Sequence, residues 1–509
     1  MRFRYMVDHR GRIGDESTLA ARQDEVCAPK HMIPNAQENR PRVRDQHLTA
    51  PEDVIPWRQR LGIGLGKMVE DASQNSIHLL SAPILNMILG MSPAALSTLA
   101  FLGRLTDAFT DPLVGSFSDN LRSRWGRRRP LMFVAAPLLA VSFAAIWFFP
   151  SNAGPVYLYV HVMVCSLLFY AVHTLYSIPV AGLALEATDD YHERTRMVAL
   201  MLAFGYVANI LGQWLFPLTQ LEVFRDAITG LRWVTGLSAL FFLVSALLPV
   251  WLCHERLYSK VVVRQPRLSL MASLKLASTV PFFVRLAVAR ALYTFGYNIV
   301  SIFVFYMNTY YVFGGDIKGS AVAFGFIGGA YHVTGLIVSI AVFPLLIRRW
   351  GKKTVFQFSC LILVAGSLAK LVLYRPGEPW WQLIITSANG AATAGINIAT
   401  FAMLGDIADC DELKNGVRRE AILSALVTWI GKVGYSAGLL LSGFVLVWIG
   451  FDALRGAQAP GTLEAMKLAY VVMPLLGAVG AIFLARKITL TEQDAYAVKA
   501  QLASRRAGR

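Results

Sequence analysis

The chain has 509 residues, of which 55% are hydrophobic and 16% are charged, and its formal net charge is +16. A soluble domain averages about 25% charged residues, so this composition excludes an ordinary soluble protein and indicates a membrane protein. The basic residues gather in short loops between apolar stretches. This placement indicates that they orient the protein in the membrane and do not bind nucleic acid. The five cysteines are scattered without metal-ligand spacing, and we expect neither a disulfide framework nor a cofactor.

The apolar stretches divide the chain into two bundles. Residues 1–58 are polar and lack a cleavable signal peptide, so we expect a disordered cytoplasmic tail without an assigned function. Six predicted spans form a bundle at 59–253, a basic cytoplasmic linker follows at 254–279, and six more spans form a bundle at 280–486. A charged cytoplasmic tail, 487–509, ends the chain. The predicted spans are 62–89, 93–117, 130–149, 156–182, 196–217, 233–253, 280–313, 321–347, 354–374, 380–404, 420–450 and 466–486.

Loop charge predicts the orientation of these spans. The loops Arg122 to Arg129, Arg256 to Lys275 and Arg348 to Lys353 are strongly basic, and they alternate with loops of almost no net charge. Basic loops face the cytoplasm, so both termini lie there too. Two six-helix halves with matched basic loops are typical of a transporter built from structural repeats. We therefore expect an all-α membrane protein of twelve transmembrane helices in two pseudo-symmetric halves.

Two acids near the end of the second span indicate the functional site. Asp107 and Asp111 are four residues apart and share one helix face. Carboxylates inside a membrane are costly and mark function by default, although a helix end in headgroup water is the alternative. Two adjacent carboxylates repel unless a cation or proton lies between them, so we predict a site for Na⁺ or H⁺. Arg104 is the nearest counter-charge on the same helix.

Two further spans carry charged side chains. Asp71, on the first span, shares its face with Asn75 and His78, and these three are candidate substrate ligands. Lys67, four residues earlier, offers a purely structural alternative because it can neutralise Asp71. Lys432, a lone cation in the eleventh span, has the acids of the second span as plausible partners, with snorkelling to the interface as the alternative.

Polar side chains recur at helical spacing on the fourth, seventh and tenth spans. Such residues either line a solute pathway or only bond neighbouring helices, and the sequence leaves both open. The candidate substrate residues among them are Tyr176, Ser177, Tyr297, Asn389, Thr393 and Asn397.

Two charged segments are candidates for a cytoplasmic gate. Ion pairs there can hold the halves closed, with membrane anchoring as the alternative for the first segment and a metal site for the second. The first segment lies in the loop after the second span and contributes Asp119, Arg122, Arg124, Arg127 and Arg128. The second is placed in the loop after the tenth span and contributes Asp406, Asp409, Arg418 and Glu420.

The segment DAFTDPLVGSFSDNLRSRWGRRRP resembles the second-helix signature of the glycoside-pentoside-hexuronide:cation symporters, a branch of the major facilitator superfamily. GLGKMVED and GDIADCDELKNGVRREAILSAL fall in family order, and the resemblance covers nearly the whole chain after residue 60. It implies a major facilitator fold and cation-coupled transport of a sugar-like solute. By this resemblance Asp107 and Asp111 bind the cation, Thr174 assists them, Lys432 lies beside them, and Asp71 binds sugar hydroxyls.

Four departures from the family pattern concern the ligands. Ser177 stands where a family acid binds sugar, Ala181 where a tryptophan stacks on it, and Leu202 where an arginine lies. Thr110 replaces an asparagine between the two cation acids, which leaves Na⁺ and H⁺ both open. Half of the sugar-binding set is therefore absent, and the resemblance does not imply a galactoside.

The sequence thus predicts a monomeric symporter, not an enzyme, that moves a small organic solute across the cytoplasmic membrane by alternating access. Its expected partners are the solute and the lipid bilayer, with no nucleic acid and no metal beyond Na⁺. The alternatives are an uncoupled or lipid-like solute carrier of the same fold and, more remotely, a polytopic membrane enzyme or receptor.

Overall fold

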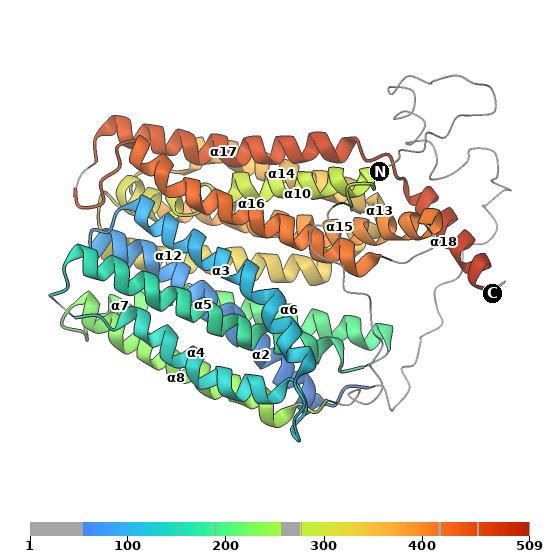
Figure 1. The fold of residues 1–509 in the computed structure, drawn as a ribbon. Coiled ribbons are helices and arrows are strands. Elements are labelled where there is room, and N and C mark those ends of the chain that lie inside the picture. Colours follow the sequence, from blue (N-terminus) through green and yellow to red (C-terminus); the bar gives the residue numbers. More distant parts are fainter. Residues whose placement is uncertain are drawn as a thin grey trace, which may run out of the picture.

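The computed structural model describes residues 54–150, 152–188, 190–255, 275, 277–415, 419–455 and 458–507. These residues form long helices that run side by side, with α17, α14 and α10 on one side of the molecule and α4, α5 and α8 on the other (Figure 1). Nearly all of the predicted N-terminal tail and central linker lies outside the described residues.

The N-terminal half holds seven named helical segments and one π-helix. Its first helix, α2, continues without a break into the π-helix η2. In chain order the elements are α2 (Trp57–Leu80), η2 (Ser81–Ile88), α3 (Pro93–Asn120), α4 (Arg129–Trp147), α5 (Pro155–Leu185), α6 (Tyr191–Gly212), α7 (Leu215–Thr219) and α8 (Ala227–Leu252).

The C-terminal half repeats this arrangement and ends with an additional helix. Its elements are α10 (Pro281–Asn298), α11 (Phe303–Tyr306), η3 (Met307–Val312), α12 (Ile317–Ile337), η4 (Val338–Val342), α13 (Phe343–Trp350), α14 (Lys352–Leu373), η5 (Pro379–Trp381), α15 (Gln382–Asn415), α16 (Glu420–Trp448), α17 (Pro460–Arg486) and α18 (Glu492–Ala507).

Local sequence explains where several helices begin. Prolines occupy the first turn of α3, α5, α10 and α17, where their missing N–H leaves no hydrogen bond unmade. Asp190, Asp226 and Asp316 cap α6, α8 and α12, and each side chain accepts a backbone N–H three residues ahead at 2.7–3.1 Å.

Among the described residues, ten helical segments are long and apolar enough to cross a membrane. The two long helices outside this set, α2 and α3, carry the acids and bases of the predicted site. Their lower apolarity therefore follows from the charged residues that the sequence places in or beside the predicted site. The count of twelve spans stays a prediction.

One prediction about the tenth span is wrong. We expected it to end at residue 404 and to place Asp406 and Asp409 in a loop, but α15 continues to Asn415. The helix persists because its last turns are covered: Cys410 packs against Val498 and Leu502 of α18. The predicted C-terminal tail thus contains a docked helix.

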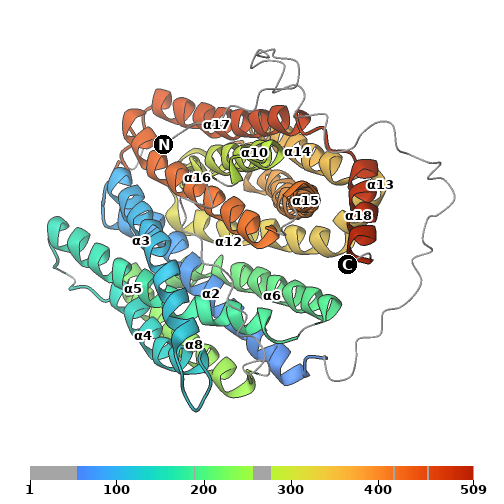
Figure 2. The same cartoon turned by 45° about the vertical axis from the view of Figure 1, so that its right-hand side comes forward.

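The two halves meet along α3 with α16 and along α6 with α12 (Figure 2). The backbone of Gly443 in α16 lies against Pro93 and Ser97 at the start of α3, and Gly328 in α12 lies against Gln213. These contacts lie toward the end of the molecule that holds the α2–α3 and α16–α17 turns, where Leu454 covers Gly90. We call this the closed end.

The hydrophobic cores follow the same division. One core combines residues of the N-terminal half with closed-end residues of the C-terminal half, such as Phe305 and Tyr306. A second core, around Phe356 and Ile407, is built from the C-terminal half alone. The halves therefore share apolar packing at the closed end and keep separate cores elsewhere.

Candidate functional site

The acids of α3 lie where the two halves face each other. Asp107 is 5% exposed and lies among polar groups from three helices. Thr174 of α5 donates to its Oδ1 at 3.4 Å, Gln74 of α2 donates to its Oδ2 at 3.3 Å, and the Arg104 guanidinium is 3.6 Å away. The carboxylate is thus held by hydrogen bonds and one cation, as a buried charge requires.

Asp111, one turn further along α3, joins the halves. Its Oδ2 is 3.0 Å from the Lys432 Nζ of α16. The two side chains are 30% and 49% exposed respectively, so this ion pair between the halves is partly accessible and not enclosed in a dry core. A partly exposed pair of this kind is weak and can be exchanged for another cation.

Two hydroxyls complete this group. Thr110 lies between the acids on α3 and its Oγ1 donates to the Thr174 Oγ1 at 2.9 Å. The structure therefore brings together all five residues predicted for the cation site: Asp107, Asp111, Thr110, Thr174 and Lys432. Carboxylate and hydroxyl oxygens suit a hard cation such as Na⁺, and either acid can instead take a proton. No cluster of three or more His, Cys, Asp or Glu able to hold a metal occurs in the described part of the chain.

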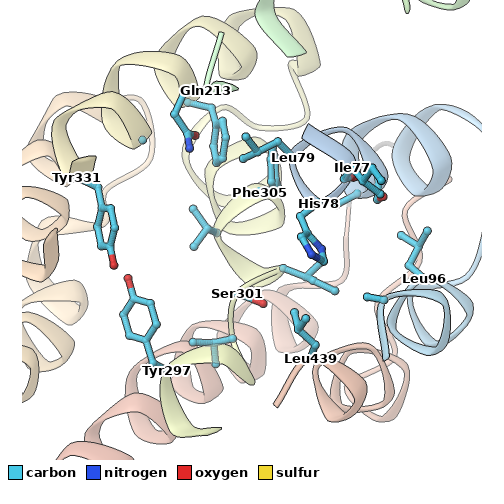
Figure 3. A pocket seen from close by; sticks show the side chains of 18 of the residues that line it. Ile77, His78, Leu79, Leu96, Gln213, Tyr297, Ser301, Phe305, Tyr331 and Leu439 are labelled. Atoms are coloured by element: carbon cyan, nitrogen blue, oxygen red, sulfur yellow. The ribbon is translucent and has the colours of Figure 1, made fainter. Parts of the chain in front are cut away.

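A cavity of about 320 Å³ lies between the halves (Figure 3). Its wall contains His78 from α2, Tyr297 from α10 and Tyr331 from α12, and the hydroxyls of the two tyrosines point toward one another. Most of the remaining wall is apolar, with Ile77, Leu79, Leu96, Phe305 and Leu439 among the labelled side chains. A largely apolar cavity with a few polar groups is typical of a small-molecule site.

Arg104 connects the acid pair with this cavity. Its NH2 lies 3.4 Å from the His78 Nε2, and its Cζ lies 4.9 Å from the centre of the Tyr435 ring. Both His78 and Tyr435 line the cavity, while the other side of the guanidinium faces Asp107. The sequence marked Arg104 only as a nearby counter-charge, because its contacts with α2 and α16 cannot be read from one helix.

Of the residues predicted for the substrate, His78, Tyr297 and Asn389 line the cavity. Lys67 lies 3.0 Å from Asp71 and 2.9 Å from Glu70, which is the structural role left open by the sequence. Tyr176 is fully buried and donates to the Ala246 carbonyl at 3.3 Å within the N-terminal half. The predicted substrate residues that lie outside the cavity wall are Asp71, Asn75, Tyr176, Ser177, Thr393 and Asn397.

Three of these residues bind neighbouring helices instead. Asn75 hydrogen-bonds Asn209 of α6, Thr393 accepts from the Tyr293 hydroxyl at 3.1 Å, and Asn397 accepts from Arg290 at 3.0 Å. Conversely, the cavity wall includes residues that the sequence did not single out: Gln213, Tyr331, His332, Lys370, Tyr435 and Tyr470. Helical spacing identifies a shared face but does not say what that face contacts.

The arginines of the first predicted gate segment are bound within the N-terminal half. Arg127 pairs with Glu186, and the Arg128 guanidinium contacts both Glu186 oxygens at 2.6 and 3.1 Å. Glu255 accepts the backbone N–H groups of residues 127, 128 and 129 at 2.8–3.3 Å. Arg122 and Arg124 are exposed, and the Asp119 side chain lies outside the described residues.

The acids of the second gate segment are bound within the C-terminal half. Lys352 reaches both Asp406 oxygens at 2.7 Å, and Lys499 of α18 lies 3.5 Å from Asp406 and 3.9 Å from Asp409. Glu420 begins α16, and Arg418 lies outside the described residues. The two segments therefore stabilise helix ends inside each half, and their role as a gate between halves stays a prediction.

The fold and the site define a multi-pass membrane transporter. Residues 62–492 match the family described as MFS/sugar transport protein, and the chain belongs to this family and to its glycoside-pentoside-hexuronide:cation symporter branch. The predictions of family and of a major facilitator fold are thus confirmed, and the relatives are transporters, not enzymes.

Individual relatives are distant in sequence. An uncharacterized symporter of Synechocystis sp. is 23% identical over 90% of this chain and 98% of its own length. The isoprimeverose transporter of Lactiplantibacillus pentosus is 24% identical over 84% of this chain and 87% of its own length. The crystal structure of the nucleoside transporter NupG (D323A mutant) superposes with a TM-score of 0.62 at 12% identity, over 85% of this chain and all of that one, which shows the fold alone.

Proposed function

We propose that this protein is a secondary symporter that couples Na⁺ or H⁺ to the movement of a small organic solute by alternating access. It acts as a monomer in the cytoplasmic membrane, has both termini in the cytoplasm and needs no cofactor. In this orientation the closed end faces outward, and we infer that the solute reaches the cavity from the cytoplasm. A relative named isoprimeverose transporter supports a sugar- or glycoside-like solute.

The observation that carries the proposal is the ion pair between Asp111 and Lys432. It joins α3 of one half with α16 of the other at 3.0 Å, one turn away from the buried Asp107. A cation or proton that neutralises Asp111 removes the attraction that holds Lys432. The occupancy of the cation site then changes the contact between the halves, which alternating access requires.

The proposal also needs a connection between cation and solute, and Arg104 supplies it. Because this guanidinium lies between Asp107 and the cavity residues His78 and Tyr435, it responds to a charge change at the acid. A cation bound beside Asp107 weakens the electrostatic attraction between that carboxylate and Arg104. The guanidinium is then freer to move toward His78 and alter the cavity wall.

The test uses Asp111→Asn, with Asp452→Asn as a matched surface control. Wild-type protein in detergent is expected to melt at a higher temperature in Na⁺ than in choline or, with H⁺ as the coupling ion, to change its melting temperature between pH 7.5 and 5.5, and Asp111→Asn is expected to lose this response. In vesicles with an imposed ion gradient, the variant is expected to lose concentrative uptake of whichever probe the wild type accumulates, isoprimeverose or 1-naphthylacetate, and to keep exchange of that probe. Normal concentrative uptake by Asp111→Asn contradicts the proposal, and gradient-independent transport by the wild type indicates an uncoupled carrier.

A further inference from the structure

Lys370 of α14 is a cation in the cavity wall without an acidic partner. It is 3% exposed, and no carboxylate among the described residues lies close enough to form an ion pair with it. Its Nζ donates to the Tyr470 carbonyl at 3.0 Å and lies 3.6 Å from the centre of the Tyr470 ring. An ammonium group has three N–H donors, and beyond this hydrogen bond and the ring contact at least one of them has no acceptor among the described residues.

An unpaired charge at this depth is costly for the protein. Burying an ammonium group without a counter-ion is unfavourable in any protein interior, and more so in a membrane protein. The other lysine near this point, Lys467 of α17, has a different environment: it donates to the Tyr311 hydroxyl at 3.0 Å and the Tyr374 carbonyl at 3.4 Å. Only Lys370 of these two lies in the cavity wall.

The rest of the wall defines what else the ligand contains. The described wall residues include no Asp or Glu, whereas they include Tyr297, Tyr331, Tyr435 and Tyr470 and many aliphatic side chains. An ionised carboxylate is a strong acceptor for the hydroxyls of a neutral sugar, and the described wall residues supply none, offering only neutral acceptors such as Gln213 and Asn389. Aromatic and aliphatic side chains instead favour an apolar body.

We propose that the solute is an organic anion, with a carboxylate or sulfonate head bound by Lys370 and an apolar or aromatic body lying against the tyrosines. The inference rests on the proposed function, because it takes the cavity to be the solute site. The anionic head supplies the counter-charge that Lys370 lacks. The second cation near the wall, Arg104, is already 3.6 Å from Asp107, which leaves Lys370 as the anion ligand.

The test measures binding of two matched probe pairs to protein in phosphatidylcholine nanodiscs. The pairs are 4-phenylbutyrate with 4-phenylbutanamide and 1-naphthylacetate with 1-naphthylacetamide, which differ only in the charge of the head group. Isothermal titration is expected to show that at least one acid binds wild-type protein tenfold or more tightly than its amide, because a hydrogen bond to a charged group is lost in the amide. Lys370→Gln is expected to abolish this preference, whereas Lys370→Arg and the control Lys467→Gln keep it.

Equal affinities for acid and amide in both pairs, or no binding of any probe, overturn the proposal without need of a variant. A preference that survives in Lys370→Gln overturns it as well. Binding is measured at fixed pH without an ion gradient, and Asp111→Asn is expected to retain the preference for the acid. Failure of the anion preference is therefore distinct from failure of cation coupling, which the melting response to Na⁺ or pH reports.

Discussion

Gly443 offers a direct test of the closed end, because it is where α16 and α3 touch. A Cβ atom added at this position would lie 2.1 Å from the Pro93 carbonyl oxygen and 2.3 Å from the Ser97 Oγ. Non-bonded heavy atoms need about 3.5 Å, so Gly443→Ala fits only if the two helices move apart. The nearest of these atoms, the Pro93 carbonyl oxygen, belongs to the backbone and cannot rotate away as a side chain can.

The size of the effect follows from this clash. Overpacking of one methyl group costs about 1–3 kcal/mol, and this cost applies only to the state in which α3 and α16 are in contact. Each 1.4 kcal/mol is a factor of about ten in an equilibrium, so Gly443→Ala is expected to favour the outward-open state by about 5- to 140-fold. Gly115→Ala, on α3 with nothing within 4 Å of the added Cβ, is the matched control.

The assay reports access to the cavity from outside. Ser301 lies in the cavity wall, so Ser301→Cys in a variant whose five native cysteines are replaced by serine provides the reporter thiol. In intact cells a membrane-impermeant maleimide is expected to label it faster in Gly443→Ala than in Gly115→Ala. Equal labelling rates in the two variants would refute the assignment of this contact as the outer closure.

Three further outcomes follow from the same geometry. Glu186→Gln removes the carboxylate charge that binds Arg128 but keeps an amide acceptor, and because both groups are mostly buried it is expected to lower stability by about 1–3 kcal/mol in thermal unfolding; an unchanged melting temperature contradicts this. Deleting α18 is expected to speed maleimide labelling of Cys410, now 4% exposed, and to leave the buried Cys360 unreactive as the internal control. Arg104→Lys keeps the charge but not the planar, two-sided guanidinium, so it is expected to retain the melting response to the cation and to lose concentrative uptake. Full uptake by Arg104→Lys excludes this residue as the connection.

The grouping of residues at the proposed cation site was predictable because these residues are conspicuous in the sequence. An acid in an apolar stretch stands out, and Asp107, Asp111 and Lys432 have few partners available within a membrane. The solute cavity was not predictable in the same way. Lys370 lies one turn from the end of α14, a position where a lysine usually extends to the membrane surface, and only the packing of α17 over it shows that it is buried.

The polar residues at helical spacing on the fourth and tenth predicted spans show a second limit of prediction from sequence. Tyr176, Thr393 and Asn397 have the spacing of a pathway, yet their hydrogen bonds go to Ala246, Tyr293 and Arg290 of neighbouring helices. Periodicity gives the angular position of a side chain on its own helix, and the partner helix decides whether that position faces a cavity or a neighbour. The acids at the end of α15 were misplaced for a related reason, since the covering helix α18 could not be foreseen.

The arrangement of charges provides a route by which the proposed cation and the solute can raise the affinity for each other. Within the described residues, the residues of the proposed cation site and those of the cavity wall do not overlap, so groups that contact both can connect the two ligands. Arg104 touches Asp107 on one side and His78 and Tyr435 on the other, and α16 carries both Lys432 and Tyr435 three residues apart. Because binding linkage is reciprocal, a cation that tightens solute binding through Arg104 and α16 must be bound more tightly by the same factor when solute is present. A symporter needs each ligand to raise the affinity for the other. The protein with both ligands bound is then the form that switches between the outward-open and inward-open states.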